Sequence, residues 1–210
     1  MKFHTAEDQS TVTPTKALEF LKEGNQRFVE NLKTNHDLLE QVNKSRESQF
    51  PFAIILSCID SRTSAELIFD QGLGDIFSTR VAGNIINDDV IGSMEFACKL
   101  AGSKLIVVLG HSNCGAIKGA CHDVKLGHLT SLLNKVQPSI NEIKKNYPSL
   151  DIKSQEGIDK VAFNNVHIMK QEIINRSVVL NEMLKNNEIG IVSAYYKVET
   201  GEVIFIDKEI

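Results

Sequence analysis

Two short stretches of the chain carry side chains that could bind a metal ion and do chemistry beside it. The first holds Cys58, Asp60 and Arg62, and the second holds His111 and Cys114. Thiolates and an imidazole suit zinc better than magnesium, calcium or manganese. Structural zinc sites close their shell with four protein ligands, whereas catalytic sites keep one position for water. Two cysteines and one histidine therefore match a catalytic zinc site, with a carboxylate and a guanidinium nearby.

The elements before these stretches explain how they could meet. Each stretch follows an apolar run that predicts a buried strand, at residues 52–56 and 105–109. Side chains two apart in extended chain point the same way, so Cys58, Asp60 and Arg62 should share one side. His111 and Cys114 are three apart, and a helical turn or tight loop could direct both to one ion. Ligands in open α/β sheets bind beyond the carboxyl ends of the strands, so two neighbouring parallel strands would bring the groups together.

Plainer interpretations of the same residues stay open. The three ligand candidates could line a buried core or close a structural zinc site, although such a site has no use for an ionised carboxylate beside an arginine. Asp60 and Arg62 could form an ordinary ion pair. Free cysteines are among the most buried residue types, and nothing directs the remaining histidines at a metal. We therefore expect Cys98 and Cys121 to be buried outside the site. His122 and His128 could act as proton shuttles, but we favour surface positions for both.

Composition indicates one ordinary globular domain. The 210 residues are enough for a single full core, and the hydrophobic and charged fractions are 42% and 24%. A net charge of −4 without a basic cluster argues against nucleic acid as a partner. We see no apolar run near the roughly 20 residues that span a bilayer, so no membrane is expected. The start lacks a signal-peptide pattern, and four cysteines without one suit a reducing cytoplasm.

Strands alternate with helices along most of the chain. Apolar runs bounded by turn residues predict five strands, at residues 52–56, 75–80, 104–109, 189–196 and 203–206. Helices are predicted at residues 14–32, 37–44, 64–69, 88–100, 115–124, 129–140 and 158–173, with a short one after Ser177. This alternation implies right-handed crossovers and a mainly parallel sheet. We expect an α/β fold with about four parallel strands, an antiparallel edge strand and flanking helices.

The first 48 residues form a helical segment ahead of the sheet. Thr13 can cap a helix that begins at Pro14, and a second, polar helix follows. These helices either wrap their own domain or embrace another subunit, and we favour the second interpretation. The chain is thus one domain over residues 1–210, with an N-terminal helical arm at 1–48 and the sheet core and C-terminal helices at 49–210.

With these residues placed, the chain resembles the β-class carbonic anhydrase family. Cys58-x-Asp60-x-Arg62 followed by His111-x-x-Cys114-Gly115 carries the resemblance. Further matches extend over most of residues 14–206: the 66–69 helix, the Arg80-x-Ala82-Gly83-Asn84 loop, the Gly92-Ser93-Met94-Glu95 helix and the final strand-turn-strand. The paired motifs, each after an apolar strand, make the resemblance strong.

The resemblance implies a role for each matching residue. Cys58, His111 and Cys114 would bind one Zn²⁺ per subunit, and Asp60 with Arg62 would form the neighbouring catalytic dyad. Four positions match substrate contacts of the family: Gln49, Phe77, Ala82 and Gly115. In the family the residue that matches Gln49 contacts the substrate of the adjoining subunit. Some members carry a bicarbonate pocket linked to a closed zinc site, but Ile55 stands at its tryptophan position. This favours the form whose zinc stays open.

The function that the resemblance implies is reversible hydration of CO2 to bicarbonate and a proton, by attack of zinc-bound hydroxide. The enzyme would be a cytoplasmic carbonate dehydratase acting as a homodimer or a dimer of dimers. One rival is a related zinc hydrolase of carbon disulfide or carbonyl sulfide. Another is a zinc-binding regulatory or scaffold protein without turnover.

Overall fold

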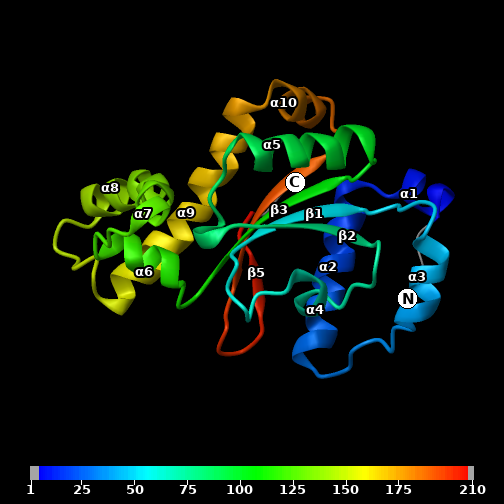
Figure 1. Cartoon of the computed structure of the whole chain (residues 1–210), viewed down its shortest axis with the longest axis horizontal. Helices are drawn as coiled ribbons and strands as arrows, with labels where there is room; N and C mark the ends of the chain where they lie inside the picture. The colour runs from blue at the N-terminus through cyan, green and yellow to red at the C-terminus, as the bar shows by residue number, and fades with distance from the viewer. Residues whose placement is uncertain (1–4, 208–210) are drawn as a thin grey trace.

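A single five-stranded sheet runs through the molecule. In this computed structural model, which describes residues 5–207, the strand order is β2-β1-β3-β4-β5. The first four strands are parallel, and β5 pairs antiparallel with β4 (Figure 1). The strands are β1 (Ala53–Ser57), β2 (Ile76–Arg80), β3 (Leu105–His111), β4 (Gly190–Tyr196) and β5 (Val203–Phe205). The predicted fold class is confirmed, including the antiparallel edge strand; residues 1–4 and 208–210 of the predicted domain lie outside the described range.

Helices pack on both faces of this sheet. The first group is α1 (Ala6–Thr11), α2 (Pro14–Val29), α3 (Leu38–Ser45) and α4 (Ala65–Ile68). The second is α5 (Asp88–Glu95), α6 (Gly115–Cys121), α7 (Gly127–Leu133), α8 (Gln137–Asn146), α9 (Gln155–Arg176) and α10 (Val178–Lys185). Two 3₁₀ helices, η1 (Ala82–Asn84) and η3 (Asn134–Val136), and a π-helical segment, η2 (Phe96–Leu100), complete the order.

Successive side chains of the central strands face opposite sides of the sheet, so the core is divided into two layers. Ile54 and Leu56 of β1 face one cluster, which includes α5, α9 and α10, while Ala53 and Ile55 face the other, which includes α2 and α4. Figure 1 shows α5 and α10 on one side of the sheet and α2 and α4 on the other. Strands buried on both faces are expected for a parallel sheet. The whole of β1 and β3 is buried, so their carboxyl ends have little freedom to move.

Two of the predicted helices show how local residues set the observed ends. The predicted 129–140 helix is interrupted at η3, and Pro138 then stands in the first turn of α8, where its missing N–H costs nothing. In mid-helix the same proline would remove a hydrogen bond. The first predicted helix stops at Val29, because Asn31 adopts a φ of 56°, and Leu32 is left exposed.

The arm packs largely on its own domain. Ala17, Leu18 and Leu21 of α2 are buried in the core layer beneath the sheet. The link to α3 is fastened by the buried Asp70, which accepts hydrogen bonds from Arg27 and from Thr34. Helix α3, by contrast, buries no residue and exposes Leu38, Leu39 and Val42. No helix of the described range is long and apolar enough to cross a membrane.

Candidate metal centre

Three buried side chains meet where β1 and β3 end. The ligand atoms of Cys58, His111 and Cys114 all lie within 4.8 Å of one another, and the two sulfurs are 3.9 Å apart. Each residue is at most 4% exposed. The strand register explains the meeting, because β1 and β3 pair in parallel and their carboxyl ends reach the same edge of the sheet. The structure thus brings together the three predicted ligand residues.

Side chains from two other segments hold the turn that carries Cys58. The Thr63 hydroxyl donates to the Cys58 and Asp60 carbonyls at 3.0 and 2.9 Å. Arg80, at the end of β2, donates from Nε to the Cys58 carbonyl at 3.0 Å and from Nη2 to the Asp60 carbonyl at 2.6 Å. The path of the chain after β1 is therefore fixed by donors from outside that strand.

The second ligand pair lies on a tight link between β3 and α6. His111 is the last residue of β3, Asn113 adopts a φ of 55°, and Cys114 is the residue before α6. Nδ1 of His111 lies 2.8 Å from the Ser112 carbonyl, which can only accept a hydrogen bond. The proton therefore sits on Nδ1. Nε2 is buried, has no hydrogen-bond partner and keeps a free lone pair that could bind a metal.

The surroundings of the two sulfurs favour one thiolate even without a metal. A hydrogen bond from Cys114, with another from the Gly83 amide, lowers the pKa of the Cys58 thiol against the opposing effect of burial. The Cys114 thiol shares its proton with Cys58, and this contact and burial raise its pKa. The backbone amides of Ala116 and Ile117 oppose that rise. A bound cation would favour deprotonation of both thiols.

Asp60 is held as a carboxylate at the rim of the cluster. Arg62 donates from Nε to Oδ1 at 2.9 Å and from Nη2 to Oδ2 at 2.8 Å, and its backbone amide adds a third bond. These side-chain bonds hold the pKa of Asp60 well below its usual range, although partial burial acts the other way. The predicted pairing of Asp60 with Arg62 is observed.

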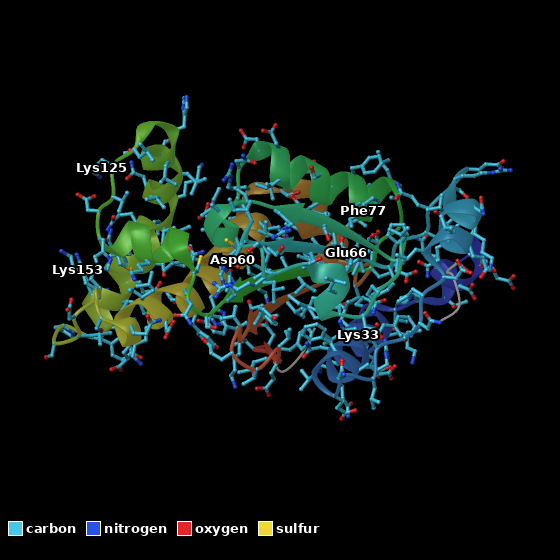
Figure 2. The ribbon with its side chains drawn as sticks, turned by 60° about the horizontal axis from the view of Figure 1, so that its bottom comes forward. Lys33, Asp60, Glu66, Phe77, Lys125 and Lys153 are labelled. Carbon is cyan, nitrogen blue, oxygen red and sulfur yellow. The ribbon has the colours of Figure 1, made fainter. Side chains whose placement is uncertain are left out.

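The predicted substrate contacts divide into two pairs. Ala82 lies in η1, next to the Gly83 amide that contacts Cys58, and Gly115 follows Cys114 with open space above its Cα. Gln49 precedes the amino end of β1, and Phe77 pairs in register with Ile54, four residues before Cys58. Figure 2 shows Phe77 well separated from Asp60 along the sheet. One chain therefore does not bring Gln49 and Phe77 to the cluster.

Sequence reasoning missed the residues that support the ligand loops. Thr63 and Ser112 are buried and hydrogen-bonded at the site, and Glu199, after β4, contacts the His111–Cys114 link. Ser112 could have been suspected, because it stands between two ligand candidates. No sequence signal points to Glu199, because the fold alone brings it near residues 111–114.

A mostly parallel sheet with a buried Cys-His-Cys cluster at the ends of two adjacent strands defines an α/β metal-binding protein. The carbonic anhydrase family model matches residues 53–203. Carbonic anhydrase 2 of Mycobacterium tuberculosis is 34% identical over 201 residues, covering 92% of this chain and 93% of that protein. The carbonic anhydrase of Mycolicibacterium smegmatis is 33% identical over 196 residues, with 90% and 92% covered. The chain belongs to the β-class carbonic anhydrase family, as the motifs predict.

Solved structures agree with this assignment. The β-carbonic anhydrase CcaA is 28% identical, covers 90% of this chain and 95% of its own, and gives a TM-score of 0.73. A Coccomyxa β-carbonic anhydrase solved with acetazolamide gives a TM-score of 0.74 at 22% identity, over 90% of this chain and 85% of that one. The second likeness supports the fold alone.

Proposed function

We propose that this protein catalyses the reversible hydration of CO2 to bicarbonate and a proton, with one zinc ion per chain. The observation that carries the proposal is the cluster of two buried sulfurs and a partnerless imidazole nitrogen beside an ionised carboxylate. Within the described residues the cluster offers three donor atoms, the number of protein ligands in catalytic zinc sites. Family membership supports the same reaction.

The donor set fits zinc. Two thiolates and a neutral imidazole are the soft and intermediate ligands that zinc prefers. The fixed tautomer of His111, with its proton bonded to the Ser112 carbonyl, is the usual second contact of a histidine that binds a metal. Zinc bound there would act as a Lewis acid that makes a water molecule a better nucleophile.

Asp60 and Arg62 would orient that nucleophile. An ionised carboxylate only accepts hydrogen bonds, so Asp60 can hold a hydroxyl proton and leave the oxygen lone pair directed at CO2. Arg62 occupies one side of both Asp60 oxygens and keeps the carboxylate charged. Because each oxygen can accept a further hydrogen bond, Asp60 remains able to contact substrate.

The second pair of substrate contacts supports a dimer. Gln49 and Phe77 lie away from their own cluster, and a second subunit could deliver them, as the family resemblance implies for Gln49. Strand β2 is one edge of the sheet, and beside it lies a hollow of about 700 Å³ lined by Phe77 and Phe96. Phe96 packs against Phe77 of β2 and is half exposed. A structural neighbour from Sordaria macrospora is described as tetrameric, so we propose a homodimer or a dimer of dimers, in which the exposed apolar face of α3, rather than the whole arm, contacts the partner.

The same site favours a reducing compartment. All four cysteines are free, and the sulfurs of Cys58 and Cys114 lie 3.9 Å apart. Oxidation of this pair would remove two of three ligands. We therefore propose a cytoplasmic location, where thiols stay reduced.

Stopped-flow CO2 hydration of zinc-loaded protein tests the function. We expect wild-type turnover, and we expect Asp60→Asn to lower kcat/KM by about 100-fold, the size of effect typical of groups that manage a proton in the transition state. Zinc content should be unchanged, because Asp60 is outside the three-ligand cluster.

Asp123→Asn is the matched control. Asp123 is exposed in the link after α6, forms an ion pair with the exposed Lys125 and has a φ of 54° that asparagine tolerates. It should retain wild-type activity. Absence of turnover in zinc-loaded wild-type protein would favour a regulatory or scaffold role instead.

A further inference from the structure

The two-residue link between His111 and Cys114 is fastened by one carboxylate from a distant segment. Ser112 Oγ donates to Glu199 Oε2 at 2.8 Å, and Asn113 Nδ2 donates to Glu199 Oε1 at 2.5 Å. Glu199 belongs to the turn between β4 and β5, 86 and 87 positions away in sequence. Both oxygens of one side chain thus bind the two residues that separate two proposed zinc ligands.

The contact is relayed to the ligand nitrogen of His111. Ser112 Oγ also accepts from the Val198 amide at 3.0 Å, and the Ser112 amide donates to the Tyr196 carbonyl at 3.0 Å. These bonds orient the Ser112 peptide, whose carbonyl accepts from His111 Nδ1 at 2.8 Å. The direction of that carbonyl sets the ring plane, and hence the direction of the Nε2 lone pair.

The link needs such a restraint because its conformation is one of several that the chain could adopt here. Asn113 has a φ of 55°, in the left-handed region that asparagine tolerates but does not prefer to right-handed or extended backbone. Asn113 is exposed, so core packing does not hold it in place. The hydrogen bond from its amide to Glu199 is a specific contact that favours this conformation.

We infer that Glu199 is a positioning residue of the metal centre, which orients His111 and Cys114 through Ser112 and Asn113. Glu199 does not belong to the ligand cluster, and its contacts are all made outside the ligand atoms. The hydrogen bond from the Ser112 hydroxyl holds the pKa of Glu199 below its usual range, so Glu199 accepts both bonds as a carboxylate. The inference rests on the proposed zinc site.

The test measures zinc affinity and metal geometry in the full-length protein. We expect Glu199→Ala to weaken zinc binding by about tenfold in a competition with a chromophoric chelator, the lower end of the effect of removing outer-shell partners. The visible absorption bands of the cobalt-substituted variant should shift, because the ring of His111 is no longer held. Glu202→Ala is the control, since Glu202 lies in the same turn and, within residues 5–207, its side chain pairs with the exposed Lys197 instead of the ligand link.

Unchanged zinc affinity and an unchanged cobalt spectrum in Glu199→Ala would overturn the inference, as would an equal effect of Glu202→Ala. If Glu199→Ala does not fold, Glu199→Gln serves instead. The glutamine of Glu199→Gln keeps an oxygen that can accept from Ser112, but its amide group faces the amide group of Asn113, so one charged hydrogen bond is weakened. We therefore expect Glu199→Gln to lose less zinc affinity than Glu199→Ala. Wild-type zinc affinity in Glu199→Gln would also contradict the positioning role of Glu199.

A double-mutant cycle with Ser112→Ala separates positioning from general loss of structure. If Glu199 acts partly through the Ser112 hydroxyl, the double variant should lose less zinc affinity than the product of the fold-losses measured for the two single variants. Fully multiplicative losses would contradict the relay. Both readouts are made without CO2, so a wild-type protein that binds zinc but lacks turnover would defeat the proposed function and leave this inference standing.

Discussion

At the residue scale, the centre depends on side chains that bind backbone around the ligands. Arg80 spans from β2 to the carbonyls of Cys58 and Asp60, and Thr63 binds the same two carbonyls. Cys58 and Thr63 are both buried, so water cannot readily replace the hydrogen bond between the Thr63 hydroxyl and the Cys58 carbonyl. Such contacts orient the first ligands of a metal and tune its affinity.

We expect Arg80→Ala to lower both zinc affinity and stability. The variant loses two hydrogen bonds from a charged donor, which corresponds to about 1.5–3 kcal/mol for a bond of this kind, and it frees the turn that carries Cys58. Zinc affinity should fall by about tenfold. Chelator competition and urea unfolding of the metal-loaded protein measure the two effects.

Arg46→Ala is the control for that substitution. Arg46 is exposed at the end of α3, and within the described range its side chain forms an ion pair with Glu47 at 3.7 Å. It should change neither quantity. Full zinc affinity in Arg80→Ala would show that the turn holds its shape without the guanidinium.

At the element scale, the free edge of the sheet is where assembly should occur. β2 pairs on one side only, with β1. An edge strand presents unpaired backbone groups that can pair with another chain. The exposed Phe96 stacks edge-on to Phe77 of β2, with ring centroids 6.2 Å apart. This edge thus combines free hydrogen-bonding groups with apolar surface.

Phe96→Asp should therefore convert the dimer to monomer at micromolar concentration. A charge would have to be buried without a partner in the interface, which is strongly unfavourable. Sedimentation velocity measures the assembly, and turnover should fall with it, because Gln49 and Phe77 would no longer reach a second centre.

The exposed Leu126, which directly precedes α7, supplies the comparison. Leu126→Asp places the same charge on an exposed apolar position outside the β2 edge and should leave the dimer intact. A dimeric Phe96→Asp protein would place the interface elsewhere.

At the scale of the whole molecule, the pH dependence of turnover follows from which groups can titrate. Arg62 holds the pKa of Asp60 below its usual range, so Asp60 is ionised at every pH above its ordinary value of about 3.9 and loses its charge only below it. Its titration cannot change activity near neutral pH. Two thiolates and an imidazole leave a zinc site formally uncharged, so the activated water should have a pKa above the value of about 7 known for three-histidine sites.

We expect kcat for CO2 hydration to rise from neutral towards alkaline pH. The nucleophile is the deprotonated form, and its fraction increases tenfold per pH unit below its pKa. Stopped-flow rates between pH 6 and pH 9, with circular dichroism to confirm that the fold persists across the range, give the profile. A flat profile would mean that proton release from the nucleophile does not limit turnover.

Local patterns account for what could be predicted. Apolar runs before Cys58 and His111 predict adjacent parallel strands, and the spacing of the sulfur and nitrogen donors predicts one shared ion; the donor atoms do converge. The break in the 129–140 helix was missed, because the apolar stripe continues across η3 while Pro138 favours a new helix start.

By itself, the sequence determined the family, the sheet and the three donor residues, because each depends on neighbouring residues and on strand ends that share one edge. Only the tertiary structure decided that Arg80 and Glu199 support the ligand loops and that His111 presents Nε2 rather than Nδ1. Hydrogen bonds between segments more than 20 or 80 positions apart leave no pattern in the local sequence. They exist only once the packed sheet has brought those segments together.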